Sequence, residues 1–143
     1  AMLRVLEALG LRQRIVELQL ADFFTFTGPK EGSEIAKILA ESDVFLHVGG
    51  TGSLDKAALE AMAERGIVVS SNDSTKPIIR AIHHALAVEQ PQAALFADAL
   101  QRVDTMDSEE RAQIGEALRK IVVADHSLRH LITKIVWIFK TNK

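Results

Sequence analysis

A short run of small residues followed by charged residues is the part of the sequence best suited to binding chemistry. The run Gly49-Gly50-Thr51-Gly52-Ser53 separates an apolar segment from a segment of strong helix formers. Its glycines let the backbone turn sharply and approach a ligand closely. The first amides of a helix lack partners inside it and lie at the positive end of its dipole, which favours phosphate. The loop and the following Leu54 are therefore predicted either to bind phosphate or merely to connect a strand to a helix.

Three charged residues follow this loop. Asp55 is placed to cap the helix, because acids stabilise first turns. Lys56 fits that explanation less well, and a cation at this position suits a diphosphate. Glu60 lies among apolar neighbours, where burial of an unpaired carboxylate is costly. We expect Glu60 either to reach solvent at a cleft or to accept hydrogen bonds from ligand hydroxyls. His47, just before the loop, is either core filler or a residue of the same cleft.

Two well-known phosphate motifs are excluded. A P-loop ends in Gly-Lys followed by Ser or Thr, whereas Lys56 is preceded by Asp55 and followed by Ala57. The dinucleotide fingerprint fails because Asp55 stands where its third glycine belongs. The loop therefore has to be interpreted from the elements around it.

Those elements predict one βαβ unit. Residues 44–48 form a short apolar run typical of a buried strand, and so do residues 67–70. Between them, residues 54–64 are strong helix formers, and Gly66 ends the predicted helix. In such folds ligands bind at the carboxyl edge of the strands. The polar run 71–77 either faces that edge or is a solvated connector.

The rest of the chain predicts mostly helices. Residues 2–18 are expected to form a helix, residues 23–27 a strand ending at Gly28-Pro29, and residues 34–41 a helix capped by Ser33. Further helices are expected at residues 78–88, 93–103, 108–124 and 127–140. The predicted class is α/β, a Rossmann-like parallel sheet with helices on both faces that ends in several consecutive helices.

The composition is that of an ordinary globular domain. Apolar residues make up 48% and charged residues 25% of the chain, and the net charge of −2 argues against a nucleic-acid partner. The absence of cysteine excludes disulfides and thiolate metal sites. No apolar run approaches the roughly 18 residues of a membrane span, so a cytoplasmic protein is the default expectation. The length suits one domain over residues 1–143.

Three segments of the βαβ unit together resemble a known family. They match the pattern of the nucleotide-sugar-binding half of retaining group-1 glycosyltransferases with the GT-B fold. The matching segments are Ser42-Asp43-Val44, Leu59-Glu60-Ala61-Met62-Ala63 and Gly66-Ile67-Val68-Val69-Ser70. The likeness extends more loosely from Phe24 to Phe139. It implies half of a GT-B fold, truncated on its N-terminal side.

The resemblance also implies a function. Members of this family transfer a sugar from a nucleoside-diphosphate sugar to an acceptor, without an obligatory metal or other cofactor. Glu60 matches the second glutamate of a family pair, the one that holds the ribose. Gly52 stands where the family usually has the first glutamate, which faces the transferred sugar. The acceptor-binding domain is missing from this segment, so the chain alone is expected to be inactive. The alternative is a non-catalytic α/β binding or scaffold module.

The C-terminal segment is amphipathic. Residues 126–143 carry aliphatic and aromatic residues together with Arg129, Lys134, Lys140 and Lys143. We expect this helix to pack on its own domain. The alternatives are peripheral contact with an anionic membrane and homo-oligomer formation. His126 and His130 lie one turn apart, but no third ligand is evident, and no metal site is predicted.

Overall fold

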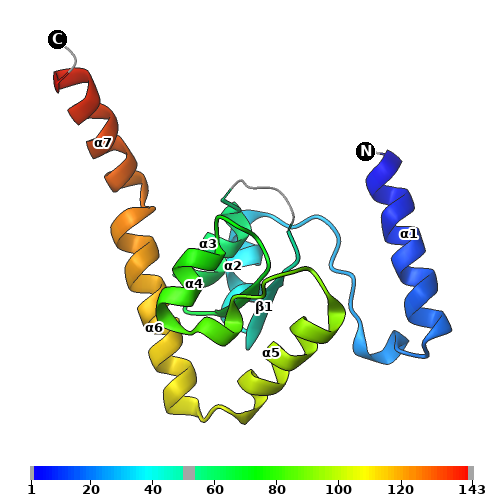
Figure 1. Ribbon diagram of the computed structural model, residues 1–143. Coiled ribbons are helices and arrows are strands. Elements are labelled where there is room, and N and C mark those ends of the chain that lie inside the picture. Colours follow the sequence, from blue (N-terminus) through cyan, green and yellow to red (C-terminus); the bar gives the residue numbers. More distant parts are fainter. Residues whose placement is uncertain (1, 50–53, 142–143) are drawn as a thin grey trace. The chain divides into compact units, whose positions relative to one another are not determined.

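The computed structural model describes residues 2–49 and 54–141, with side chains from residue 10 onward (Figure 1). The chain divides into two compact units, Ala1–Glu31 and Gly32–Lys143. Each unit has its own arrangement of elements, and the second contains the predicted βαβ unit.

The first unit confirms the predicted helix but not the predicted strand. Helix α1 spans Met2–Glu17, and a single 3-10 turn, η1, spans Ala21–Phe23. The strand expected at residues 23–27 is wrong. Phe24 does have an extended backbone, with φ −122° and ψ 129°, but no strand pairs with it among the described residues of this unit. Aromatic residues favour strands only where a neighbouring strand completes the ladder.

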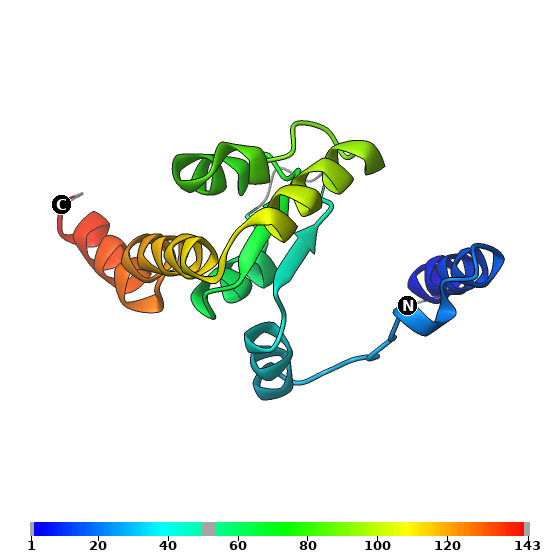
Figure 2. The same cartoon turned by 90° about the horizontal axis from the view of Figure 1, so that it is seen from below.

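The second unit is built on two parallel strands joined by a helix. Strand β1 spans Val44–His47, helix α3 spans Lys56–Ala63, and strand β2 spans Ile67–Ser70. Their register sets Val44 opposite Ile67 and His47 opposite Ser70. A single parallel bridge between Ser70 and Ala87 adds a third extended position on the other side of β2. The predicted Rossmann-like α/β class is confirmed (Figure 2).

Helices α2, α4, α5 and α6 surround the strands. They span Gly32–Ala40, Lys76–Ile82, Ala93–Thr105 and Ser108–Asp125. Helix α2 begins before Ser33, so Ser33 lies inside the helix and does not cap it. The helix expected at residues 78–88 begins earlier and stops at Ile82. The chain has to become extended there, because the amide of Val88 donates to the carbonyl of Ser70 at 2.9 Å. Residues His84–Leu86 form a 3-10 turn, η2, on the way.

The core lies where α3 and α6 pack on β2. All four residues of β2 are buried, and so are Ala58, Ala61 and Met62 on α3. Helix α3 ends where Arg65 adopts a left-handed backbone, φ 64°, and the amide of Gly66 donates to the carbonyl of Ala61 at 2.9 Å. At Gly115, α6 passes so close that a Cβ there would lie 2.2 Å from the carbonyl oxygen of Arg65.

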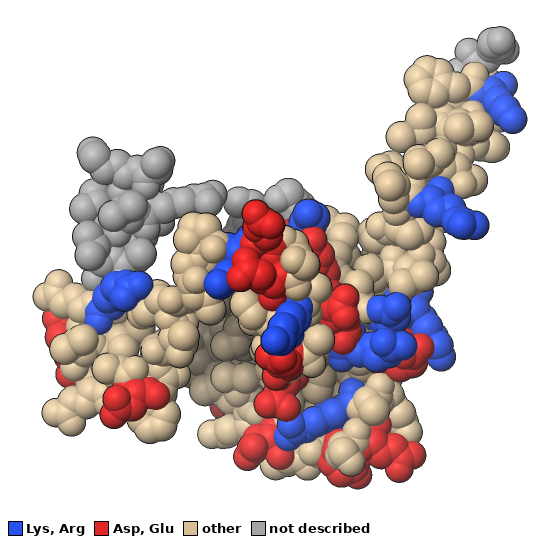
Figure 3. Space-filling model, turned by 180° about the vertical axis from the view of Figure 1, so that it is seen from behind, with Lys and Arg blue, Asp and Glu red and all other residues tan. Residues whose placement is uncertain are grey.

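Helix α7, Leu128–Thr141, has no buried residue. The expectation that this helix packs on its own domain is wrong for the described chain. It leaves the body of the unit after the end of α6 and runs away from it (Figures 1 and 2). Every residue from 131 to 141 is exposed. Figure 3 shows α7 from behind as uncharged surface interrupted only by basic side chains.

Candidate functional site

The candidate site lies at the carboxyl ends of β1 and β2, where α3 begins. Of the residues predicted to bind ligand, Gly50, Thr51, Gly52 and Ser53 lie outside the described residues. The others surround the same edge. Leu54 is half-buried just before α3, Lys56 is the first residue of α3, and Glu60 follows one turn later. Parallel strands present their carboxyl ends to ligands in folds of this kind.

Three polar side chains and one backbone amide join the strand ends to the start of α3. We refer to the residues that supply them, Asp55, His47, Ser70 and Asn72, as the strand-end network. The Nε2 atom of His47 lies 3.0 Å from Oδ2 of Asp55, and its Nδ1 atom lies 3.1 Å from Oγ of Ser70. The backbone amide of Asn72 donates to the same Oγ at 3.1 Å. Ser70 and Asn72 are almost fully buried.

The chemistry of the partners assigns the protons in this network. An ionised carboxylate only accepts, so His47 Nε2 carries the proton shared with Asp55. With the imidazole in this neutral tautomer, Nδ1 accepts a hydrogen bond from the hydroxyl of Ser70. The hydroxyl oxygen in turn accepts from the amide of Asn72. One continuous chain of hydrogen bonds therefore holds both strand ends to the entrance of α3.

Asp55 also caps α3, as its position in the sequence predicts. Its backbone is extended, and its Oδ1 atom accepts from the amide of Ala57 at 2.8 Å. This explains why α3 begins at Lys56 and not at Leu54. The cap occupies one of the free amides that a phosphate would use. Phosphate binding by this loop stays a prediction and depends on the other amides.

Lys56 and Glu60 form a pair on the exposed side of α3. Nζ of Lys56 lies 3.2 Å from Oε1 of Glu60, and the side chains are 88% and 40% exposed. An exposed pair of this kind contributes little to stability, about 0.3–0.5 kcal/mol on a helix. Lys56 and Glu60 can therefore give up their ion pair and bind a ligand instead, at little cost in stability. Glu60 reaches solvent, as expected for a carboxylate in an apolar stretch.

After β2 the chain forms a turn that the side chain of Asn72 stabilises. Its Oδ1 atom accepts from the amides of Ser74 and Thr75, at 2.9 and 3.1 Å. Next to this turn, Lys76 is nearly buried, and its Nζ lies 2.8 Å from Oδ1 of Asp73 and 3.3 Å from the carbonyl oxygen of Glu89. The polar run 71–77 is thus an ordered part of the site edge.

Ser71 adds an unsatisfied group to this edge. Its Oγ atom is buried and has no hydrogen-bond partner among the described residues. Buried hydroxyls are normally paired, because desolvating one without a partner is costly.

Sequence reasoning did not identify Ser70, Asn72 and Lys76 as site residues. The available signal was an uninterrupted polar run, residues 70–76, directly after three apolar strand residues and ending in a lysine before Pro77. Such a run at the carboxyl end of a strand is where a parallel fold concentrates its polar groups. The pairing of His47 with Asp55 across the loop could not be read from spacing alone.

The Asp73–Lys76 pair predicts a measurable pH dependence. The hydrogen bond and positive charge of Lys76 hold the pKa of the Asp73 carboxyl below its ordinary value of 3.8. The contribution of this pair to folding stability is therefore complete above that value and is lost as the pH falls through the lower folded-state pKa. A carbon-detected NMR titration should give Asp73 a low midpoint that returns toward 3.8 in Lys76→Met. Identical midpoints in both proteins would refute the pairing.

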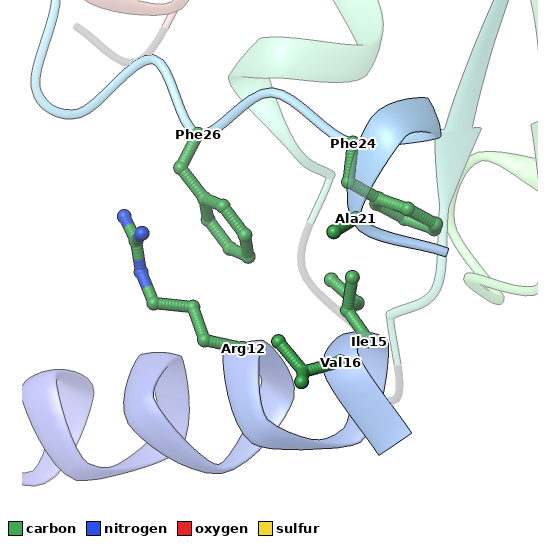
Figure 4. Close-up of a pocket in the computed structure, with 6 residues that line it drawn as sticks. All are labelled: Arg12, Ile15, Val16, Ala21, Phe24 and Phe26. Atoms are coloured by element: carbon green, nitrogen blue, oxygen red, sulfur yellow. The ribbon is translucent and has the colours of Figure 1, made fainter. Parts of the chain in front are cut away.

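A separate hollow lies in the first unit. It has a volume of about 200 Å³ and is lined by Arg12, Ile15, Val16, Ala21, Phe24 and Phe26 (Figure 4). The guanidinium of Arg12 lies 3.9 Å from the centre of the Phe26 ring. Its lining is apolar except for Arg12, which makes this cation–π contact with Phe26.

Comparison with known proteins identifies a family. The family model described as "Glycosyl transferases group 1" matches residues 7–121, which include both strands, α3 and the whole strand-end network. No curated protein and no solved structure matches the chain. The family match covers most of the sequence, and the chain therefore belongs to the group 1 glycosyltransferases.

Proposed function

We propose that this chain is the donor-binding part of a glycosyltransferase that moves a sugar from a nucleoside-diphosphate sugar to an acceptor. The observation that carries the proposal is the pair of exposed, exchangeable charges, Lys56 and Glu60, beside the ordered polar edge of β1 and β2. Family membership supplies the reaction class. An acceptor-binding domain outside residues 1–143 would complete the enzyme, and the chain alone is expected to be inactive.

Lys56 and Glu60 suit two neighbouring parts of a nucleoside diphosphate, the diphosphate and the ribose. They lie four residues apart on one helix face, which corresponds to a rise of about 6 Å. Lys56, at the positive end of α3, is placed for the diphosphate. Glu60, one turn further from the loop, is placed to accept hydrogen bonds from the ribose hydroxyls. On this proposal, ligand binding replaces a weak mutual ion pair with two charge-assisted contacts.

The same edge would stabilise the leaving group. When the bond from the sugar to the diphosphate breaks, negative charge develops on the diphosphate oxygens. A lysine and helix amides fixed in advance stabilise such charge without reorganising during the reaction. The strand-end network contributes by holding the start of α3 in place through Asp55. The network residues are buried or already hydrogen-bonded, so we assign them positioning roles.

Replacing Glu60 with Gln tests this proposal. Loss of a charge-assisted hydrogen bond costs about 1.5–3 kcal/mol, so nucleoside-diphosphate affinity should fall roughly tenfold or more. Stability should hardly change, because the amide keeps the shape and the carboxylate is partly exposed. Glu64→Gln is the matched control, since Glu64 lies four residues after Glu60, directly after the last residue of α3, and is exposed. Its affinity should equal that of the wild type.

Binding is measured by titrating uridine, guanosine and adenosine diphosphates into the isotope-labelled chain. The backbone resonances of Leu54, Lys56 and Ala57 should shift before those of α5. The free nucleosides should bind in a way that depends on Glu60 but not on Lys56. If Glu60→Gln binds as tightly as wild type, or if shifts appear only elsewhere, a non-catalytic scaffold module becomes the better description.

A further inference from the structure

Helix α7 presents an exposed apolar face that no other described part of the second unit covers. Its side chains are exposed to an unusual degree, with Leu128 at 71% and Phe139 at 74%. Successive residues of a helix are rotated by about 100°, which brings the aliphatic and aromatic residues, apart from Trp137, into one arc of roughly 160°. The members of this apolar arc are Leu128, Leu131, Ile132, Ile135, Val136, Ile138 and Phe139.

The charges on α7 are of one sign and lie beside this arc. The helix contains no acidic residue. Arg129 and Lys140 lie along one border of the apolar arc, and Lys134 lies along the other. Long basic side chains at such borders can bury their stems beside apolar surface while their charges reach anionic groups. The neighbouring helix α6 differs, because it carries acids as well as bases.

The length of α7 decides how it can meet a lipid phase. Fourteen residues span about 21 Å at 1.5 Å per residue, which is less than the roughly 30 Å of a hydrocarbon core. None of the helices in the described part of the chain is long and apolar enough to cross a membrane. A helix with this distribution lies flat in the interface, with its apolar face toward the acyl chains.

We propose that α7 docks this domain on the surface of a membrane that contains anionic lipids. The inference goes beyond sugar transfer and does not depend on donor binding. A second copy of the chain fits the face less well. Two α7 helices packed arc to arc would bring Arg129, Lys134 and Lys140 near like charges, with no acid on the helix to offset them. Lipid phosphates supply the negative charge that the helix itself lacks.

Vesicle co-sedimentation of the full chain tests the proposal. The chain should sediment with vesicles of phosphatidylcholine mixed with phosphatidylglycerol, and much less with phosphatidylcholine alone. High salt should weaken the binding, because it screens exposed charges. Lys134→Gln should lower the affinity about fivefold, the effect of one basic residue near an anionic surface. Phe139→Ser should lower it about tenfold or more, since it removes a large apolar side chain from the lipid.

Two matched variants separate docking from general changes in charge or hydrophobicity. Lys37→Gln on α2 and Phe23→Ser in η1 alter exposed side chains of other elements, and both should bind like wild type. All variants should keep the circular dichroism of the wild type, because the changed residues are exposed. Trp137, the single tryptophan of the chain, lies opposite the apolar arc. Its fluorescence should therefore remain open to quenching by acrylamide in the bound state.

Several results would overturn the proposal. Equal binding to neutral and anionic vesicles would show that the basic residues beside the apolar arc do not contribute to binding. Absence of binding to either kind of vesicle would exclude a lipid surface as the partner of α7. A stable dimer in analytical ultracentrifugation that Phe139→Ser dissociates would identify a second copy as the occupant of the apolar arc.

Discussion

Replacing Gly115 with alanine is expected to destabilise the second unit by about 1–3 kcal/mol, the usual cost of overpacking a fitted interior. The added Cβ would lie 2.2 Å from the carbonyl oxygen of Arg65. That oxygen cannot move away cheaply, because Arg65 is held in a left-handed backbone at the end of α3. Arg119 also donates to the carbonyl of Ala63, which ties α6 to the same turn. Alanine favours the helix by about 1 kcal/mol relative to glycine. The expected net loss means that the clash costs more than this gain in helix propensity.

Gly32→Ala is the control for this experiment. Gly32 is the first residue of α2 in the same unit, and a Cβ added there would meet nothing within 4 Å. Its replacement should leave the unit unchanged or stabilise it slightly. Denaturant unfolding followed by circular dichroism compares the two variants directly. Equal stability of both would mean that α6 does not approach α3 as closely as the structure has it.

The βαβ unit was predictable because its signals are local. The apolar strands, the helix formers between them and the capping acid Asp55 each act within a few residues of sequence. The strand expected around Phe24 failed for the opposite reason, since a strand depends on a partner that its own residues do not specify. The helix after Lys76 was predicted too long because the pairing of Val88 with Ser70, 18 positions away, overrides the local helix preference.

The candidate site was predictable only in part. Glu60 could be named because it matches the glutamate of the family pattern, and Lys56 because stabilisation of the first turn does not explain a cation at a helix start. The strand-end network could not, because it depends on the register that sets His47 opposite Ser70. A sequence fixes that register only through the packing of the whole unit. The burial of Lys76 likewise depends on Glu89, which folding brings back to the start of α4.

Replacing Met62 with alanine is expected to have the largest effect on stability, a loss of about 2–5 kcal/mol. Its side chain is fully buried between α3 and the rest of the core. Removing it deletes apolar contacts and leaves a cavity that the surrounding side chains fill only partly. Met62→Leu is the matched control, because it conserves most of the volume and should cost less than about 1.5 kcal/mol. Similar losses for both variants would contradict tight packing at this position.

Met62 and Glu60 belong to the same five-residue segment, Leu59-Glu60-Ala61-Met62-Ala63, yet the structure gives them opposite tasks. Met62 points into the core, whereas Glu60 reaches solvent beside Lys56. Met62→Ala should therefore lower the folded fraction while the molecules that remain folded bind nucleoside diphosphate with unchanged affinity. Glu60→Gln should do the reverse. Affinities measured well below the unfolding transition separate the two effects. If Met62→Ala also weakened binding by the folded protein, the position of α3 would depend on the core more than on the strand-end network.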